Sequence, residues 1–251
     1  MFFSHLMHIK RTDLVLEIGP GSSPYWRADV LADKFDNNDP TPDGNFGSGG
    51  LRTDGKPFFK LINNRLPFRD NAFDYIICSH VLEHVPAGEI PVLLGEIFRI
   101  APKAYIEFPA PLYDIVHSFE AHINFLDIDD DTIYCFPKSK ASCINKSFSD
   151  FTMYLRTHHR YHAARGQEHL IAVGKEFCRG QCTFELITDE EKFFGIVKEK
   201  TYYCHKAMLP WRGMNLLKGK ISARLGRRLD RKRLEAIVAQ EALPQLQVRG
   251  E

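Results

Sequence analysis

The sequence predicts an α/β fold, a Rossmann-like, doubly wound and mostly parallel sheet with a shortened first crossover and C-terminal hairpin and helical additions. Three observations predict it. Short apolar runs recur through the first part of the chain, each bounded by Gly, Pro, Asn or Asp. An apolar pattern of helical spacing separates the last two runs. A Gly-Pro-Gly turn follows the first run at once.

Five runs are predicted to be strands. The first, "DLVLEI", ends before Gly19, and the others are residues 28–33, 56–62, 73–79 and 104–109. Their β-branched, aromatic and aliphatic residues are typical of buried parallel strands. Between the last two runs, behind Pro86, apolar residues recur at helical spacing and predict a βαβ unit: Ile90, Leu93, Leu94, Ile97, Phe98 and Ile100.

The rest of the chain has a weaker pattern. Residues 36–55 are polar and predict an exposed loop long enough to cover a site. Residues 122–138 predict a hairpin that turns at Asp129 to Asp131, residues 147–166 a helix and residues 182–188 a strand. We divide the chain into a Rossmann-like core (1–111), a remainder with substrate-side insertions (112–205) and a basic amphipathic helical tail (206–251).

Composition indicates an ordinary soluble globular protein. The chain has 251 residues, of which 44% are hydrophobic and 26% charged, and a formal net charge of +1. It shows neither a signal-peptide pattern nor an apolar run long enough for a membrane span, so we expect a cytoplasmic protein. The six cysteines are scattered, which suits a reducing compartment better than a disulfide framework. The sequence does not set the oligomeric state.

The turn "EIGPG" predicts a ligand site. Its glycines allow close approach of backbone to a ligand, and Glu17 can accept hydrogen bonds from a hydroxyl or ammonium group. Dinucleotide binding needs a small residue where Pro24 stands and a helix aimed at the pyrophosphate, but only about seven residues follow Gly21 before the next strand. A phosphate-free adenosine ligand with a cationic amino-acid tail fits better. The alternative is a structural turn without a ligand.

Three segments in order, "LEIGPGSSP" (16–24), "LPFRDNAFDYIICSHVLEHV" (66–85) and "LLGEIFRIAPKAYIEFPAP" (93–111), carry a family resemblance. The chain resembles class I S-adenosylmethionine-dependent methyltransferases of the bacterial type 11-like kind. The resemblance implies S-adenosyl-L-methionine as cofactor, S-adenosyl-L-homocysteine as product, and O- or N-methylation of a small-molecule or glycan acceptor. A membrane-associated saccharide is one such acceptor.

The resemblance also implies roles for single residues. Asp33 falls where the family binds the ribose hydroxyls, with Asp36 as the fallback and a solvent-facing strand end as the alternative. Ile62 replaces the family's usual acidic residue, which leaves adenine recognition to Asn63 or backbone; Asn63 is otherwise a turn residue. The cofactor-binding set is Glu17, Gly19, Pro20, Gly21, Asp33, Asn63, Ser79 and His80.

Methyl transfer needs a general base only when the acceptor is a hydroxyl or a protonated amine. The candidates are His80, His117 and His122, in loops expected to border the site, because histidine titrates near neutral pH. The alternative for each is a structural or exposed histidine, and we expect a structural role for His84. Tyr113 either positions substrate or packs.

The histidines and cysteines do not predict a metal site. His158 and His162 lie one helical turn apart, and Cys178 and Cys182 precede Cys204 and His205, but these are not the paired spacings of zinc proteins. We therefore expect no bound metal.

Residues 218–233 hold eight Lys or Arg and one acidic residue, above an apolar stripe of Leu217, Ile221, Leu225 and Leu229. This pattern is compatible with packing on the domain, with contact to an anionic membrane surface, or with nucleic acid, for which no recognition module is present. Loss of catalysis, leaving a methyltransferase-like binding protein, is the alternative to an enzyme, and it rests on the short crossover and Ile62.

Overall fold

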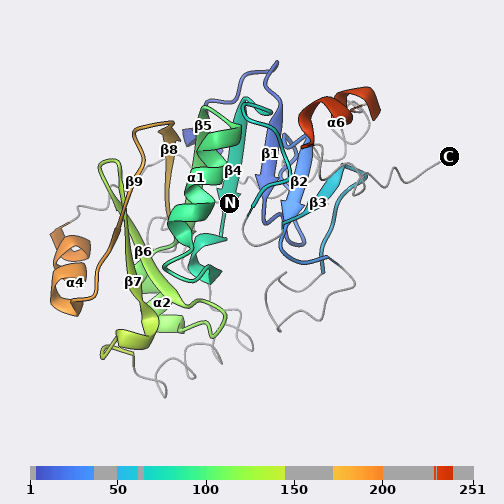
Figure 1. The fold of residues 1–251 in the computed structure, drawn as a ribbon. Helices are drawn as coiled ribbons and strands as arrows, with labels where there is room; N and C mark the ends of the chain where they lie inside the picture. Colours follow the sequence, from blue (N-terminus) through green and yellow to red (C-terminus); the bar gives the residue numbers. More distant parts are fainter. Residues whose placement is uncertain are drawn as a thin grey trace.

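The computed structural model describes residues 4–36, 50–61, 65–144, 172–199, 229 and 231–239. Within these residues the main sheet has the order β3-β2-β1-β4-β5-β8 (Figure 1). Its first five strands are parallel, and β8 runs antiparallel to β5. The predicted α/β class and the five predicted strands are confirmed: β1 (Val15–Ile18), β2 (Val30–Asp33), β3 (Phe58–Lys60), β4 (Tyr75–Ser79) and β5 (Lys103–Pro109).

The first crossover is short and contains no helix, as predicted. Residues 19–29, which connect β1 to β2, form turns and irregular backbone. Side chains take over the hydrogen bonds that a helix would make internally. The N–H of Tyr25 donates to Glu17 Oε2 at 2.7 Å, and Lys56 Nζ donates to the carbonyl of Tyr25 at 2.7 Å. The backbone at this end of the sheet is therefore fixed by charged residues of the chain itself.

The two faces of the main sheet are covered differently. Helix α1 (Ile90–Ile100) packs on one face and buries Ile90, Leu93 and Ile97, as its spacing predicts. The other face carries Val15, Tyr75, Ile77 and Tyr105. Leu6, Met7 and Ile9 from the N-terminal segment cover this face together with Tyr25. This segment begins with η1 (Ser4–Leu6). The strands are thus buried on both sides, which explains their nearly continuous apolar sequences.

A C-terminal helix, α6 (Arg231–Ile237), belongs to the main core. Its Leu234 and Ile237 are buried in the same cluster as Phe68. Backbone hydrogen bonds also attach the end of α6 to the segment before β4. The Arg69 N–H donates to the Ile237 carbonyl at 3.0 Å, and the Ala239 N–H donates to the Pro67 carbonyl at 2.9 Å. Of the predicted apolar stripe in the tail, Leu229 packs against this core; Leu217, Ile221 and Leu225 lie outside the described residues.

A smaller sheet has the order β6-β7-β9. The predicted hairpin is confirmed as β6 (Asn124–Asp129) and β7 (Thr132–Pro137), and the predicted later strand as β9 (Thr183–Leu186), parallel to β7. Helix α4 (Glu190–Glu199) covers this sheet by packing Phe193 and Val197 on Phe125 and Phe136.

Strand β8 (Ala172–Cys178) was not predicted, because Gly174, Lys175 and Glu176 interrupt its apolar pattern. It lies at the edge of the main sheet, where one side can stay polar. The helix predicted over 147–166 falls outside the described residues, as does most of the predicted 36–55 loop. No described helix is long and apolar enough to cross a membrane.

Candidate functional site

Several of the predicted ligand residues lie on one level of the sheet, at the carboxyl ends of the parallel strands. Asp33 ends β2, and Gly19 stands beside it because its N–H donates to the carbonyl of Ala32 at 2.9 Å. The pairing of Ile18 with Cys78 brings Gly19 level with Ser79, and Ser79 pairs with Glu107. Adjacent strands are about 4.8 Å apart. This row, Asp33, Gly19, Ser79 and Glu107, spans the switch in strand order between β1 and β4, where open α/β sheets bind ligands.

Glu17 on β1 is only 5% exposed. Its Oε2 accepts the backbone N–H of Tyr25 at 2.7 Å, so the side chain holds the first crossover in place. Burial raises the pKa of Glu17 to about 7, against the lowering effect of this hydrogen bond and of Lys56. The carboxyl group is therefore balanced between its two protonation states near neutral pH.

The glycine turn has a structural requirement of its own. Gly19 has a φ of +69°, and a Cβ atom built on it would lie 2.3 Å from Cγ2 of Val81, in the loop after β4. Gly21 also has positive φ, at +52°, and Pro20 between them is buried. Close packing between the two loops thus explains Gly19 without a ligand.

Asp33 is 9% exposed, and its Oδ1 accepts the N–H of Phe35 at 3.2 Å. Burial raises its pKa to about 6. The fallback residue, Asp36, lies beyond the strand end with its Oδ2 3.9 Å from Lys60 Nζ. Asp33 is thus the one of the two that belongs to the row. Asn63 lies outside the described residues.

His80 follows β4 in a left-handed conformation, with φ +58°. Its N–H donates to the carbonyl of Glu107 at 2.8 Å, and its ring lies between two carboxylates. Nδ1 is 3.3 Å from Glu83 Oε1, and Nε2 is 3.4 Å from Glu107 Oε1. A backbone conformation that is uncommon for histidine is thus held by contacts on both sides of the ring.

Glu107 is fully buried and heavily bonded. Ser79 Oγ donates to its Oε1 at 2.8 Å and Tyr105 Oη to its Oε2 at 2.6 Å. Burial alone would raise the pKa of Glu107, but His80 and Tyr105 hold it below its usual range. Burial alone would lower the pKa of His80, but Glu107 and Glu83 raise it to about 9. A protonated His80 between two carboxylates leaves one surplus negative charge, and it cannot accept a proton at neutral pH.

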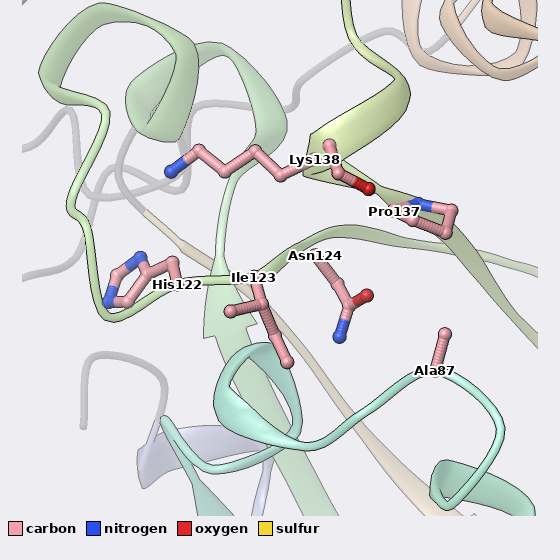
Figure 2. Close-up of a pocket in the computed structure, with 7 residues that line it drawn as sticks. Ala87, His122, Ile123, Asn124, Pro137 and Lys138 are labelled. Atoms are coloured by element: carbon pink, nitrogen blue, oxygen red, sulfur yellow. The ribbon is translucent and has the colours of Figure 1, made fainter.

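A pocket of about 430 Å³ lies between the loop after η3 (Leu82–His84), the start of β6 and the end of β7 (Figure 2), and its Ile123 N–H donates to the carbonyl of Glu83 at 2.8 Å. It is lined by Ala87, His122, Ile123, Asn124, Pro137, Lys138 and Ser139. Of the three histidines predicted as bases, only His122 lines it. His117, at the end of α2 (Pro111–His117), is buried and packs on Tyr113 with ring centroids 4.4 Å apart.

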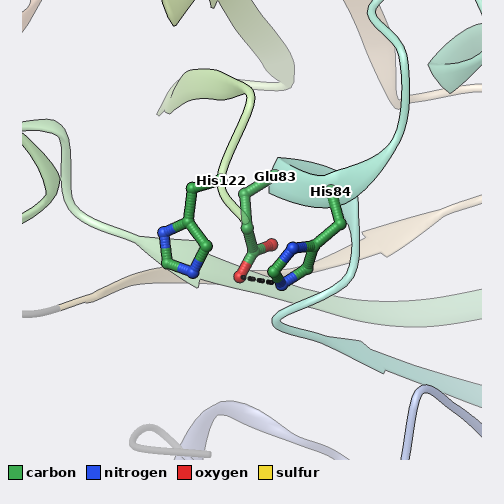
Figure 3. Close-up of side chains that lie close together, drawn as sticks. All are labelled: Glu83, His84 and His122. Carbon is green, nitrogen blue, oxygen red and sulfur yellow. Dashed lines mark ion pairs between the residues drawn. The ribbon is translucent and has the colours of Figure 1, made fainter. Parts of the chain in front are cut away.

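Glu83, His84 and His122 converge (Figure 3); Glu83 contacts His80, and His122 lines the pocket. His84 lies on η3, which begins after a two-residue gap beyond the end of β4, and its Nδ1 is 2.8 Å from the carbonyl oxygen of Ala121. His122 Nδ1 is 3.0 Å from Asp114 Oδ1. Sequence reasoning missed both Glu83 and Glu107. The signal for Glu107 was a charged residue inside the apolar strand "AYIEFP", where a buried carboxylate needs partners.

Residues 59–108, from β3 to β5, match the family model of a methyltransferase domain. No curated protein matches the chain. Solved structures match at low identity. A SAM-dependent methyltransferase from Methanosarcina mazei is 19% identical, with 48% of this chain and 68% of that chain covered and a TM-score of 0.30.

A protein from Pyrococcus horikoshii OT3 is 16% identical, with 49% of this chain and 60% of that one covered and a TM-score of 0.32. An S-adenosylmethionine-dependent methyltransferase from Mesorhizobium loti is 14% identical, with 46% and 53% covered and a TM-score of 0.30. The chain thus spans between about half and two thirds of the length of these proteins. No residue of this chain is assigned a role from them.

Proposed function

We propose that this chain, a class I methyltransferase by its matched domain and its sheet order, transfers a methyl group from S-adenosylmethionine to a small-molecule or glycan acceptor. One observation carries the proposal. The row at the carboxyl ends of β1, β2, β4 and β5 brings Asp33, Gly19 and Ser79 together with a buried surplus of negative charge.

The site fits a cationic, phosphate-free cofactor. No helix follows β1, so the helix N-terminus that would bind a pyrophosphate is missing from the described crossover. A surplus negative charge favours the sulfonium and ammonium groups of S-adenosylmethionine. Asp33 offers carboxylate oxygens at the strand tip for ribose hydroxyls, as the ribose-binding acid of a Rossmann-like fold does.

S-adenosylmethionine supplies the activated methyl group and the leaving group, and the protein must align the acceptor and exclude water. His80, fixed between Glu83 and Glu107, orders the loop after β4 beside the Gly19 turn. Its raised pKa, about 9, suits it to hold negative charge in place rather than to take a proton from the acceptor.

The pocket is our candidate for the acceptor site. Polar side chains line it, namely His122, Asn124, Lys138 and Ser139. Asn124 is held by its Nδ2 donating to the Val85 carbonyl at 2.7 Å, and Lys138 by its Nζ donating to the Phe119 carbonyl at 2.9 Å. Ala87, Ile123 and Pro137 complete the lining, so the pocket suits an acceptor that presents an apolar face together with hydroxyls, as a saccharide ring does.

Calorimetry with S-adenosylmethionine and S-adenosylhomocysteine tests the cofactor assignment. We expect Asp33→Ala to weaken binding of both by at least about tenfold, because a ribose hydroxyl loses a charged acceptor. The matched control is Asp36→Ala, three residues away, which should change binding less than about twofold. Binding of neither compound by the unmodified chain would favour the alternative, a methyltransferase-like binding protein. Release of S-adenosylhomocysteine in the presence of candidate saccharides and amines then identifies the acceptor.

We also propose that the basic segment 218–233 contacts an anionic membrane surface. Its eight Lys or Arg and single acidic residue support this, whereas the burial of Leu234 and Ile237 just beyond it favours packing on the domain. Replacing Lys218, Lys220 and Arg224 by Gln leaves the helix α6 residues intact. Unchanged sedimentation of this variant with anionic liposomes would remove the membrane proposal.

A further inference from the structure

We propose that Glu83, His84 and His122 bind a divalent transition-metal ion beside the pocket. Two histidines and one carboxylate are a common protein donor set for such ions. The site lies outside the Asp33 to Glu107 row but shares Glu83 with the charge cluster around His80, so a bound ion would offset the surplus negative charge of that cluster. Figure 3 shows the three side chains directed toward a common point.

The spacing is close to that of a bound ion. One ligand atom from each residue lies within 4.8 Å of the other two, and Glu83 Oε1 is 3.9 Å from His84 Nε2. Zinc at about 2.0–2.1 Å from each donor would place tetrahedral donors about 3.4 Å apart. The three groups therefore need to close by about 1 Å, which rotation of their side chains can supply.

Contacts at Nδ1 orient the imidazole rings of His84 and His122 for metal binding. Nδ1 of His84 faces the Ala121 carbonyl at 2.8 Å, and Nδ1 of His122 faces Asp114 Oδ1 at 3.0 Å. Each contact requires the proton on Nδ1 and leaves the lone pair on Nε2. Metal-bound histidines almost always have such an outer partner on the other nitrogen. Only Nε2 of each ring then remains as the donor atom.

The buried carboxylate of Glu83 supplies an independent observation. Its residue is 1% exposed, and among the described residues neither of its oxygens accepts a hydrogen bond. Oε1 has an ion-pair contact with His80 Nδ1 at 3.3 Å, which leaves hydrogen-bonding capacity unused on both oxygens. His80 offsets part of the charge of Glu83, but leaving the remaining lone pairs of a buried carboxylate without hydrogen bonds is costly unless they coordinate a metal. An ion at this point would remove that cost.

The donor set selects among metals. Imidazole suits zinc, copper, iron and nickel, whereas magnesium prefers oxygen ligands and waters. Three protein donors leave at least one coordination position open, and His122 lines the pocket, so that position faces the proposed acceptor site. The expectation of no metal rested on other histidines and cysteines, since Glu83 and His84 are adjacent in sequence and His122 is distant.

The role of the ion in methyl transfer rests on the proposed function. An acceptor hydroxyl bound at the open position would release its proton to solvent water more readily, because a divalent cation stabilises the alkoxide. The alkoxide oxygen would then bond to the methyl carbon as the carbon–sulfur bond breaks and S-adenosylhomocysteine leaves. The same Nε2 atom cannot bind an ion and accept a proton at once. This inference therefore replaces the predicted general-base role of His122 with that of a ligand.

The test uses the tag-free full-length chain, without S-adenosylmethionine, so that its outcome does not depend on the cofactor. We measure bound metal after dialysis against Zn²⁺, and titrate Zn²⁺, Co²⁺ and Mg²⁺ by calorimetry. Unmodified protein should retain about one Zn²⁺ per chain, give the visible spectrum of protein-bound Co²⁺, and bind Mg²⁺ far more weakly.

Variants assign the ion to the site. Glu83→Gln and His122→Ala should each abolish the high-affinity ion, and Asp114→Asn, which alters the carboxylate that contacts both His122 and Lys138, should weaken it about 10–100-fold. His8→Ala is the control, because that ring is 75% exposed and away from the site. Melting without metal shows whether each variant is folded. An ion retained by Glu83→Gln and His122→Ala, or no ion bound by the unmodified chain, would overturn the proposal.

Discussion

Replacing Glu17 by Gln should stabilise the protein at alkaline pH while weakening the cofactor site. Burial raises the pKa of Glu17 from 4.5 to about 7, so the folded state disfavours the ionised form. The stability associated with this group is complete below pH 4.5 and is lost as the pH rises to about 7. At 1.36 kcal/mol per pKa unit, the loss above pH 7 is about 3 kcal/mol. Gln removes the charge but keeps an oxygen for the Tyr25 N–H.

Urea unfolding of both proteins at several pH values between 5 and 8 measures the effect. The gain in the free energy of unfolding should be about 1 kcal/mol at pH 5 and about 3 kcal/mol at pH 8. On the proposal that Glu17 lies near the ammonium group of S-adenosylmethionine, affinity for this cofactor at pH 8 should fall by about tenfold, because an anion near the cationic tail is removed. A stability difference that does not change with pH would refute the reasoning about burial of this carboxyl group.

Three further predictions concern other parts of the molecule. Gly19→Ala should destabilise the protein by about 2 kcal/mol or more, since its Cβ would meet Val81 at 2.3 Å and its φ is +69°; thermal melting measures this, and adding Val81→Ala should recover part of the loss. Leu234→Ala should cost about 2 kcal/mol or more in urea unfolding, because the side chain is buried in the main core, whereas Lys232→Ala, on the exposed side of α6, should cost little. Glu107→Gln should lower the pKa of His80 from about 9 in an NMR titration of its ring, and an unchanged value would show that Glu107 does not hold its charge.

The sequence predicts the parallel core because its strands are buried on both faces. Such strands are almost wholly apolar, so β1, β2 and β4 are recognisable without tertiary information, and Gly19 and Asp33 also mark where β1 and β2 end. Strand β8 could not be recognised in the same way. It lies at an edge, where Lys175 and Glu176 remain partly exposed and find partners such as Tyr75, whose Oη donates to Glu176 Oε2 at 2.6 Å.

The candidate site likewise has one part that the sequence predicts and one part that it does not. The tips of strands can be predicted from turn residues, and Asp33, Gly19 and Ser79 are brought together by strand register alone. The cluster around Glu83 depends on the loop before β6 folding back against η3, through Ile123 N–H donating to the Glu83 carbonyl at 2.8 Å. No local pattern encodes that contact, so neither the pairing of His84 with His122 nor the pocket was predictable.

The attachment of α6 has a consequence for synthesis of the protein. Arg69 Nε donates to the carbonyl of Val238, 169 positions away along the chain, and Val238 also pairs with Phe68 beside β4. A ribosome that has translated the whole main sheet has still not released the residues that close one side of it. The apolar surface that α6 covers therefore stays exposed until translation ends, so chaperones and the rate of translation should affect the yield of folded protein.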